Sequence, residues 1–203
     1  MNIEIKDLDK RDYNTAREYA IKGMNLSRYT EKKFELYFYS KYFFYLELLR
    51  ATQILGAYEE KNLVGVLLVD ITNKPKKVKS FWYSLYVHFV KMIMNIGYKN
   101  SADVYTIVND EMLKRYKQNN NSDGELIFFA VDPMIKGKGI GTLLLNALEE
   151  REKGKNIYLY TDSGCTYQFY DRKGFKKEDE QNVQITIHNK TKELTCFLYS
   201  KKL

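Results

Sequence analysis

The chain has 203 residues, of which 44% are hydrophobic and 29% charged, and its formal net charge is +7. A chain of this length can bury one sizeable core, so we expect a single domain over residues 1–203. No run of about 18 apolar residues occurs, which argues against export and membrane spanning. We therefore expect a cytoplasmic protein that has no membrane partner.

Charge and cysteine usage narrow the possible partners. The lysines are scattered and many have acidic residues close by, which is typical of a solvated surface rather than a nucleic-acid site. A basic RNA-directed enzyme stays an alternative. Cys165 and Cys196 lack the spacing of a metal site, and His88 and His188 stand far apart. We expect two free thiols, no metal and no Ser-His-Asp triad.

The first half of the chain alternates between strand and helix patterns. Apolar spacing and turn residues predict a strand at 3–8, helices at 10–24 and 30–50, and a hairpin of strands 53–58 and 63–71. Residues 73–121 then hold two further predicted helices. The first, at 80–98, is hydrophobic around most of its circumference, and the second, at 103–121, is more polar. The first could cover the sheet or present an exposed patch to a partner.

The second half predicts a parallel strand-helix-strand unit. A strand at 124–133, a helix at 142–151 and a strand at 156–162 follow one another, with a glycine loop at the end of the first strand. A short helix at 165–174 comes next. The last pattern is a hairpin with arms at 175–188 and 192–200 that turns at Asn189-Lys190.

The glycine loop lies within AVDPMIKGKGIGTLLL, residues 130–145. Gly137, Gly139 and Gly141 carry no side chain and can adopt φ > 0, so their backbone N–H groups can converge on an anion. The helix that begins near Thr142 adds its unpaired N–H groups at the same point. A diphosphate fits this arrangement, although a tight turn without a ligand would give the same residues.

The order of a strand, VDP, KGKGIG, a TLLLNALEE helix, YLYTD and a short helix ending in FYDRKGF resembles the GNAT superfamily of acyl-CoA-dependent N-acyltransferases. The resemblance is good over 125–203 and looser over 53–71. It implies an α/β (α+β) fold, with a mixed, twisted central sheet of about seven strands flanked by helices. The segment 73–121 is a helical insertion whose position resembles that in puromycin acetyltransferase-like members.

The resemblance also implies a cosubstrate, acetyl-CoA, and the residues that bind it. The coenzyme A pyrophosphate is expected at the family's R/Q-x-x-G-x-G/A pattern, here Lys136, Gly137, Lys138, Gly139, Ile140, Gly141 and Thr142. Lys136 keeps the cation but not the guanidinium geometry. The main chain of Phe129, Ala130 and Val131 is expected to pair with pantetheine where the fourth and fifth strands splay. Ser163 stands where the family often has Asn.

Tyr170 occupies the tyrosine of the family's FYxKxGF motif, with Arg172 in place of Lys. The resemblance implies that Tyr170 protonates the leaving thiolate, although a packing role is also possible. The amine must lose a proton, and the candidate bases are Glu125, Glu59, Asp70 and Asp162, none of which the sequence favours. An acyl-cysteine route through Cys165 lacks a nearby His and is disfavoured.

The leading functional expectation is transfer of an acetyl group from acetyl-CoA to a primary amine of a small molecule, by direct attack in a ternary complex. A protein N-terminal or lysine N-acetyltransferase, and a non-catalytic acyl-CoA-binding regulatory module, stay open. Enclosing insertion helices would favour the small acceptor, with Trp82, Tyr83, Tyr86 and Phe89 as its roof. A homodimer is considered, but the sequence does not decide it.

Overall fold

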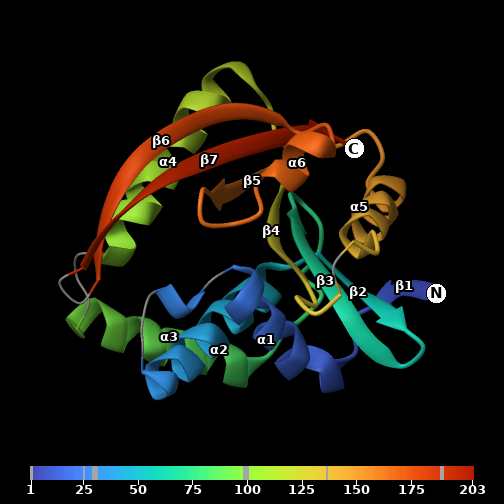
Figure 1. The fold of residues 1–203 in the computed structure, drawn as a ribbon, viewed down its shortest axis with the longest axis horizontal. Helices are drawn as coiled ribbons and strands as arrows, with labels where there is room; N and C mark the ends of the chain where they lie inside the picture. Colours follow the sequence, from blue (N-terminus) through green and yellow to red (C-terminus); the bar gives the residue numbers. More distant parts are fainter. Residues whose placement is uncertain (1, 25, 29–31, 98–100, 136, 188–189) are drawn as a thin grey trace.

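The computed structural model describes residues 2–24, 26–28, 32–97, 101–135, 137–187 and 190–203. One seven-stranded sheet in the order β1-β2-β3-β4-β5-β7-β6 forms its centre, as Figure 1 shows. The strands are β1 (Ile3–Asp7), β2 (Gln53–Glu59), β3 (Asn62–Ile71), β4 (Gly124–Val131), β5 (Asn156–Asp162), β6 (Lys176–Ile187) and β7 (Lys190–Lys202). Neighbouring strands are antiparallel except β4 and β5, which are parallel. The predicted fold class and strand number are confirmed.

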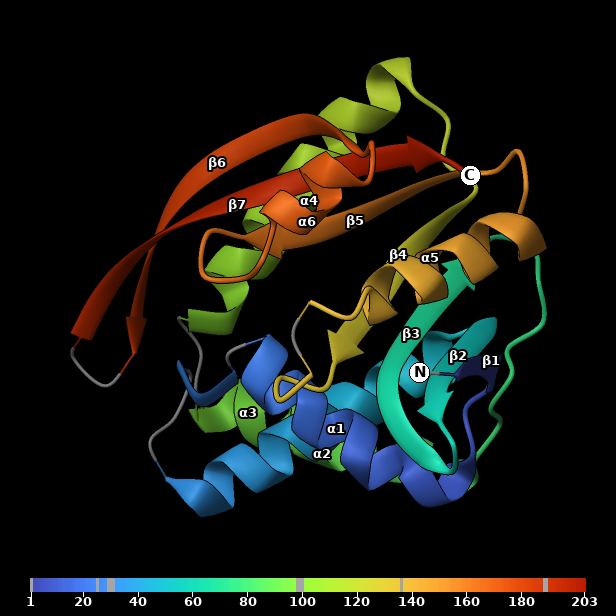
Figure 2. The same cartoon turned by 45° about the vertical axis from the view of Figure 1, so that its right-hand side comes forward.

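The helices follow the predicted order. They are α1 (Tyr13–Gly23), α2 (Lys33–Arg50), α3 (Phe81–Gly97), α4 (Ser101–Asn119), α5 (Ile140–Arg151) and α6 (Gln168–Arg172), with short 3-10 turns at Lys10–Asp12 and Leu26–Arg28. Figure 2 shows α5 on one side of β3 and β4, and α1 and α2 on the other. Helix α5 begins at Ile140, two residues before the expected Thr142.

Alternation along the central strands builds a core on each face of the sheet. In β3, Val66 and Leu68 pack with α1 and α2, whereas Leu67 and Val69 pack with α5. All four are fully buried, because helices cover both faces. This explains why the strand reads as an unbroken hydrophobic run rather than an alternation.

The two insertion helices lie in different places. Helix α3 packs along α2, where the rings of Tyr83 and Tyr45 stack with centroids 4.2 Å apart. Helix α4 instead covers β6 and β7, and its Met112 is buried beside Leu198. The segment between β3 and β4 therefore packs on two separate parts of the fold, with α3 on α2 and α4 on the C-terminal hairpin.

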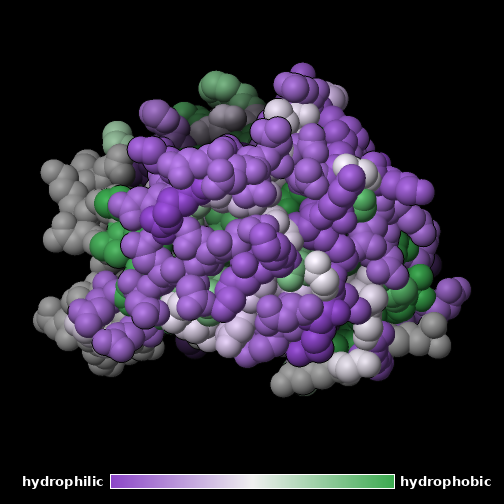
Figure 3. Space-filling view, turned by 90° about the horizontal axis from the view of Figure 1, so that it is seen from above, coloured by the Kyte–Doolittle hydropathy of each residue, from purple (hydrophilic) through white to green (hydrophobic). Residues whose placement is uncertain are grey.

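The outer face of α3 is the exposed apolar patch foreseen as one of two possibilities. Phe81 and Trp82 are each 73% exposed, and Leu85, Phe89, Met92 and Ile93 are also exposed. The face seen from above in Figure 3 differs, because hydrophilic side chains cover most of it. None of the described helices combines the length and apolar character that a membrane span needs.

The second arm of the C-terminal hairpin is longer than predicted. Lys190 was expected in the turn but belongs to β7, where it pairs with Ile187. Asn189, the other residue of the predicted turn, and His188, at the end of the predicted first arm, lie outside the described residues. The ladder between β6 and β7 continues to the pair Ile187 and Lys190.

Candidate functional site

The parallel strands β4 and β5 pair over only two residues. The pairs are Gly124 with Ile157 and Glu125 with Tyr158, and among the described residues the ladder ends there. Beyond this point β4 continues to pair with β3 on its other edge. The main chain from Phe129 to Val131 therefore presents an open edge towards β5, as expected. Such an edge can accept an extended amide chain as an added strand.

A bulge in β4 accompanies this separation. The register with β3 shifts between Leu68 and Val69, whose partners are Phe128 and Leu126, so Ile127 has no direct partner. A bulge bends its strand and increases the local twist. Phe129 and Val131 consequently pack towards α5, whereas Phe128 and Ala130 pack towards α1 and α2.

The glycine loop has the backbone geometry that its sequence predicts. Gly137 and Gly139 have φ of +76° and +72°, in the left-handed region that favours glycine. A Cβ atom at either position would have nothing within 4 Å, so open space lies beside the loop. Lys138 is exposed, and Lys136 lies outside the described residues.

Helix α5 begins directly at this loop. Gly139 is its N-cap residue and makes no side-chain capping bond, and the first helical hydrogen bond runs from Leu143 N to Gly139 O at 3.0 Å. The N–H groups of Ile140, Gly141 and Thr142 precede that bond and point out of the helix end. The helix dipole adds positive potential there, so the loop can cradle an anion by main-chain atoms alone.

Gly141 has a different role from the two loop glycines. A Cβ atom there would lie 3.3 Å from the ring of Phe169 and 3.5 Å from that of Phe129. These two rings meet edge to face with centroids 5.5 Å apart. The absence of a side chain at Gly141 thus lets α5, α6 and β4 approach one another beside the glycine loop.

Tyr170 joins the same assembly from α6. Its ring lies among those of Phe129, Phe169, Phe175 and Tyr199, at centroid distances of 5.4 to 6.5 Å. Burial raises the pKa of Tyr170, so its hydroxyl keeps its proton at neutral pH. None of the hydrogen bonds within the described part of the chain involves this hydroxyl, which leaves it able to donate to a ligand.

The part of the chain that holds the glycine loop and Tyr170 matches a known family of proteins. Residues 104–177, which run from α4 through β4, the glycine loop, α5, β5 and α6, match the family model described as an acetyltransferase (GNAT) domain. Over these residues the chain is similar to a GNAT acetyltransferase domain, the domain of acyl-CoA-dependent N-acyltransferases.

Solved structures share the GNAT fold over the whole chain. The PaiA N-acetyltransferase of Thermoplasma acidophilum, solved with coenzyme A, has 19% identity, a TM-score of 0.57 and full coverage of both chains. An N-acetyltransferase of Staphylococcus aureus Mu50 has 16% identity and a TM-score of 0.52, and the match covers 100% of this chain and 99% of that one. At these identities the similarity shows the fold alone. By sequence, no curated protein matches the chain.

Ser163, within the matched residues, forms two hydrogen bonds with β7. Its Oγ accepts a hydrogen bond from Thr195 N at 3.0 Å, and its own N–H donates to Thr195 O at 2.9 Å. The side chain therefore closes the end of β5 onto the hairpin. A contact from Ser163 to a ligand stays a prediction.

The four candidate bases differ in their surroundings. Asp70 is paired with Lys76, buried Asp162 accepts from Gly164 N at 2.7 Å in a tight turn, and Glu59 lies at the β2–β3 turn. Glu125 instead lies where β4 and β5 separate. It is the one of the four that belongs to β4 itself, and Asp70 of β3 is its partner in the neighbouring register.

Glu125 is held by a residue that the sequence did not single out. Arg50, at the end of α2, donates to Glu125 at 2.5 Å and to Glu47 at 3.1 Å. Burial raises the pKa of Glu47 to about 8, although the positive charge of Arg50 offsets part of this rise. Glu47 therefore carries its proton for most of the time at neutral pH, and Arg50 balances mainly the charge of Glu125. The i, i+3 spacing of Glu47 and Arg50 was the available signal.

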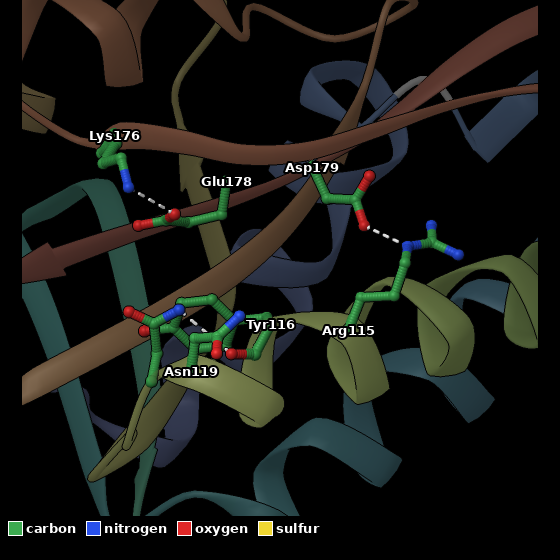
Figure 4. A pocket seen from close by; sticks show the side chains of 7 residues that line it. Arg115, Tyr116, Asn119, Lys176, Glu178 and Asp179 are labelled. Carbon is green, nitrogen blue, oxygen red and sulfur yellow. Dashed lines mark hydrogen bonds and ion pairs between the residues drawn. The ribbon is translucent and has the colours of Figure 1, made fainter.

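A groove between α4 and β6 lies apart from these residues. Figure 4 shows Arg115 pointing to Asp179 and Lys176 pointing to Glu178, with ion-pair distances of 2.7 and 2.8 Å. Because its charges are already paired, this groove offers little to a charged ligand. Cys165 is partly exposed and Cys196 is buried, and among the described residues no group of three His, Cys, Asp or Glu side chains could hold a metal ion.

Proposed function

We propose that the chain transfers an acetyl group from acetyl-CoA to a primary amine of a small molecule, by direct attack in a ternary complex. One observation carries the proposal. The glycine loop, the open edge of β4 and the hydroxyl-bearing ring of Tyr170 lie together around Phe129 and Gly141. A phosphate site, an amide-binding edge and a proton donor are the three features that an acyl-CoA requires.

The chemistry of the residues present supports the binding of coenzyme A. The main chain of 137–142 would hold the pyrophosphate, because left-handed glycines, open space and a helix N-terminus coincide there. The main chain of Phe129, Ala130 and Val131 would pair with the pantetheine amides. When bound, acetyl-CoA supplies an acetyl group activated as a thioester.

Two side chains would handle the protons. Tyr170 donates its phenolic proton to the sulfur as the bond between the carbonyl carbon and sulfur breaks, which avoids a bare thiolate in an apolar site. Glu125 accepts, directly or through water, the proton that the amine loses as its nitrogen bonds to the carbonyl carbon. Arg50 holds the Glu125 carboxylate in place.

The two faces of the sheet support a placement of the two substrates on opposite sides. The glycine loop and α6 lie on the face of α5, whereas Glu125 is bonded to Arg50 from α2 on the other face. An acyl group that passes between the separated strands would therefore meet its acceptor on the side of α1 and α2. Helix α3, packed along α2, adds bulk to that side and favours a small acceptor over a folded protein surface.

The direct test is thiol release from acetyl-CoA with a panel of small primary amines and a matched panel of peptides with free N-termini or lysines. Turnover with the small amines supports the proposal. Turnover confined to peptides would replace it with protein acetylation, and tight coenzyme A binding without turnover on any amine would indicate a binding module.

A further inference from the structure

A buried arginine in α1 has no acidic partner among the residues that the structure describes. Arg17 is only 7% exposed, and its Nε and Nη1 atoms are buried without a hydrogen-bond partner in the described part of the chain. The guanidinium lies over the ring of Tyr37, 4.7 Å from the centroid. A ring face offsets part of the lost hydration of a cation but does not satisfy its N–H donors.

A second cation lies in the same cluster. Lys41 Nζ is 5.7, 5.6 and 5.2 Å from the ring centroids of Tyr37, Tyr45 and Tyr86. Neither Arg17 nor Lys41 forms an ion pair with any described residue. Two cations thus share a wall of tyrosine rings, an arrangement that repels a cationic ligand and attracts an anionic one.

The tyrosines of this cluster can also act as donors. Burial raises the pKa of Tyr45, and it raises that of Tyr86 to about 12. Both hydroxyls therefore stay protonated at neutral pH. The Tyr86 hydroxyl donates a bond of 3.3 Å to Phe38 O. The Tyr86 proton is thus already used within the fold, whereas Arg17 and Lys41 supply positive charge beside these rings.

The cluster lies on the acceptor side of the proposed reaction. Ala16 and Ala20, which flank Arg17 on α1, belong to the same buried group as Phe128 and Ala130 of β4. At the end of α1, a Cβ atom on Gly23 would lie 4.0 Å from the Ala130 side chain. Helix α1 thus follows the face of β4 opposite to α5 and connects the arginine cluster to the open strand.

We propose that Arg17, assisted by Lys41, binds an anionic group of the amine acceptor, either a carboxylate or a phosphate. This inference rests on the proposed function and names the acceptor class, an amine that also bears an acid. A guanidinium buried without a partner lowers the stability of the fold, and an anion that accepts from Nε and Nη1 removes that penalty.

Matched acceptor pairs test the inference by turnover. L-phenylalanine is compared with phenylalaninamide, and O-phosphoethanolamine with ethanolamine, so that the two sources of charge are tested separately. We expect kcat/KM for the favoured anionic member to exceed that of its neutral partner by about 30-fold or more. Arg17→Met should abolish this preference, and Lys41→Met should reduce it. Equal rates within both pairs would overturn the inference while leaving amine acetylation established.

Binding without turnover provides the second test. With coenzyme A present to fill the glycine loop, 3-phenylpropanoate and phenyl phosphate are titrated against thermal unfolding. We expect at least one of them to raise the Tm of the wild type and not that of Arg17→Met. Lys22→Met on α1 and Lys33→Met on α2, both exposed, are the matched controls and should respond like the wild type.

The Tm values without ligand separate binding from packing. If Arg17 is an anion site, Arg17→Met should match or exceed the wild-type Tm, because an apolar side chain replaces an unpaired buried cation. A large loss of Tm, with no response of the wild type to either anion, would assign Arg17 to packing and overturn the inference.

Should Arg17→Met fail to fold, the anion response of Lys41→Met decides: its loss supports the inference, and an unchanged response overturns it. If no amine is acetylated but the anion response still needs Arg17, the proposed function fails and the anion site remains.

Discussion

Glu125 and Tyr158 form the last pair of residues that joins β4 to β5, and the Tyr158 hydroxyl donates a hydrogen bond of 3.3 Å to the Glu125 carboxylate. Arg50 binds the same carboxylate from α2. One carboxylate is therefore fixed at the point where the strands part, on the face opposite the glycine loop. This position is the reason why we propose Glu125 as the proton acceptor for an incoming amine.

Replacing Glu125 by Gln should lower kcat/KM for an alkyl amine by about 100-fold, because the amine must lose a proton to react. The loss should be much smaller for a weakly basic aromatic amine, which is already neutral at pH 7. Steady-state rates with the two amine types measure the difference. Glu59→Gln, at the turn between β2 and β3, is the control. Equal losses for both amines would show that Glu125 has only a structural role.

Gly139→Glu should abolish coenzyme A binding, because it places a carboxylate beside the main-chain N–H groups that would hold the pyrophosphate. The substitution also strains a residue at φ of +72°. Gly154→Glu reproduces both the strain, at φ of +85°, and the charge in a turn far along the chain, and it should keep the affinity. Calorimetric titration with coenzyme A compares them. Equal affinities would refute the assignment of the loop.

Tyr170→Phe should lower kcat by about 100-fold while the affinity for coenzyme A and the Tm stay close to those of the wild type. The ring packing is retained and only the hydroxyl is lost. Tyr167→Phe, one turn earlier, should leave kcat unchanged. Since burial raises the pKa of Tyr170, its titration should not limit the rate below about pH 9 in a pH profile of the wild type. An unchanged kcat in Tyr170→Phe would exclude the proton-donor role.

Glu47→Gln should make stability less dependent on pH. The folded chain raises the pKa of Glu47 from 4.5 to about 8, so between these values it binds a proton that the unfolded chain has released. The carboxyl therefore destabilises the fold progressively as the pH rises through this window. We expect the variant to be more stable than the wild type by about 1 to 3 kcal/mol at pH 9 and nearly equal at pH 5. Urea unfolding at both pH values measures this, and a difference that shrinks with rising pH would contradict it.

The outer face of α3 should be dispensable for stability. Trp82 and Phe89 are 73% and 55% exposed, so they make few contacts that their removal would break, and their role as a roof stays a prediction. Trp82→Ala and Phe89→Ala should change the unfolding free energy by less than about 0.5 kcal/mol. Tyr83→Ala removes the stacking on Tyr45 and should cost about 3 kcal/mol. A raised acceptor KM in Trp82→Ala would support the roof hypothesis.

Much of the fold could be predicted because its signals are local. The apolar spacing of α2 and β3 marks each as helix or strand, and the two loop glycines mark positions of positive φ before α5. The motif around Tyr170 fixed its place in the chain relative to that loop. These features depend on residues within one or two turns of each other, so the sequence alone determines them.

Tertiary structure decided what covers each surface and which charges meet. The apolar circumference of α3 predicts burial, yet only packing decided that α2 takes one face and leaves the other exposed. Glu125 was one of four equivalent carboxylates until sheet register brought it to Arg50, 75 residues away in sequence. Arg17 likewise carried no signal, because burial without an acidic partner is a property of the assembled helices. Spacing encodes which face of an element is apolar, whereas pairings between distant elements arise only when the chain folds.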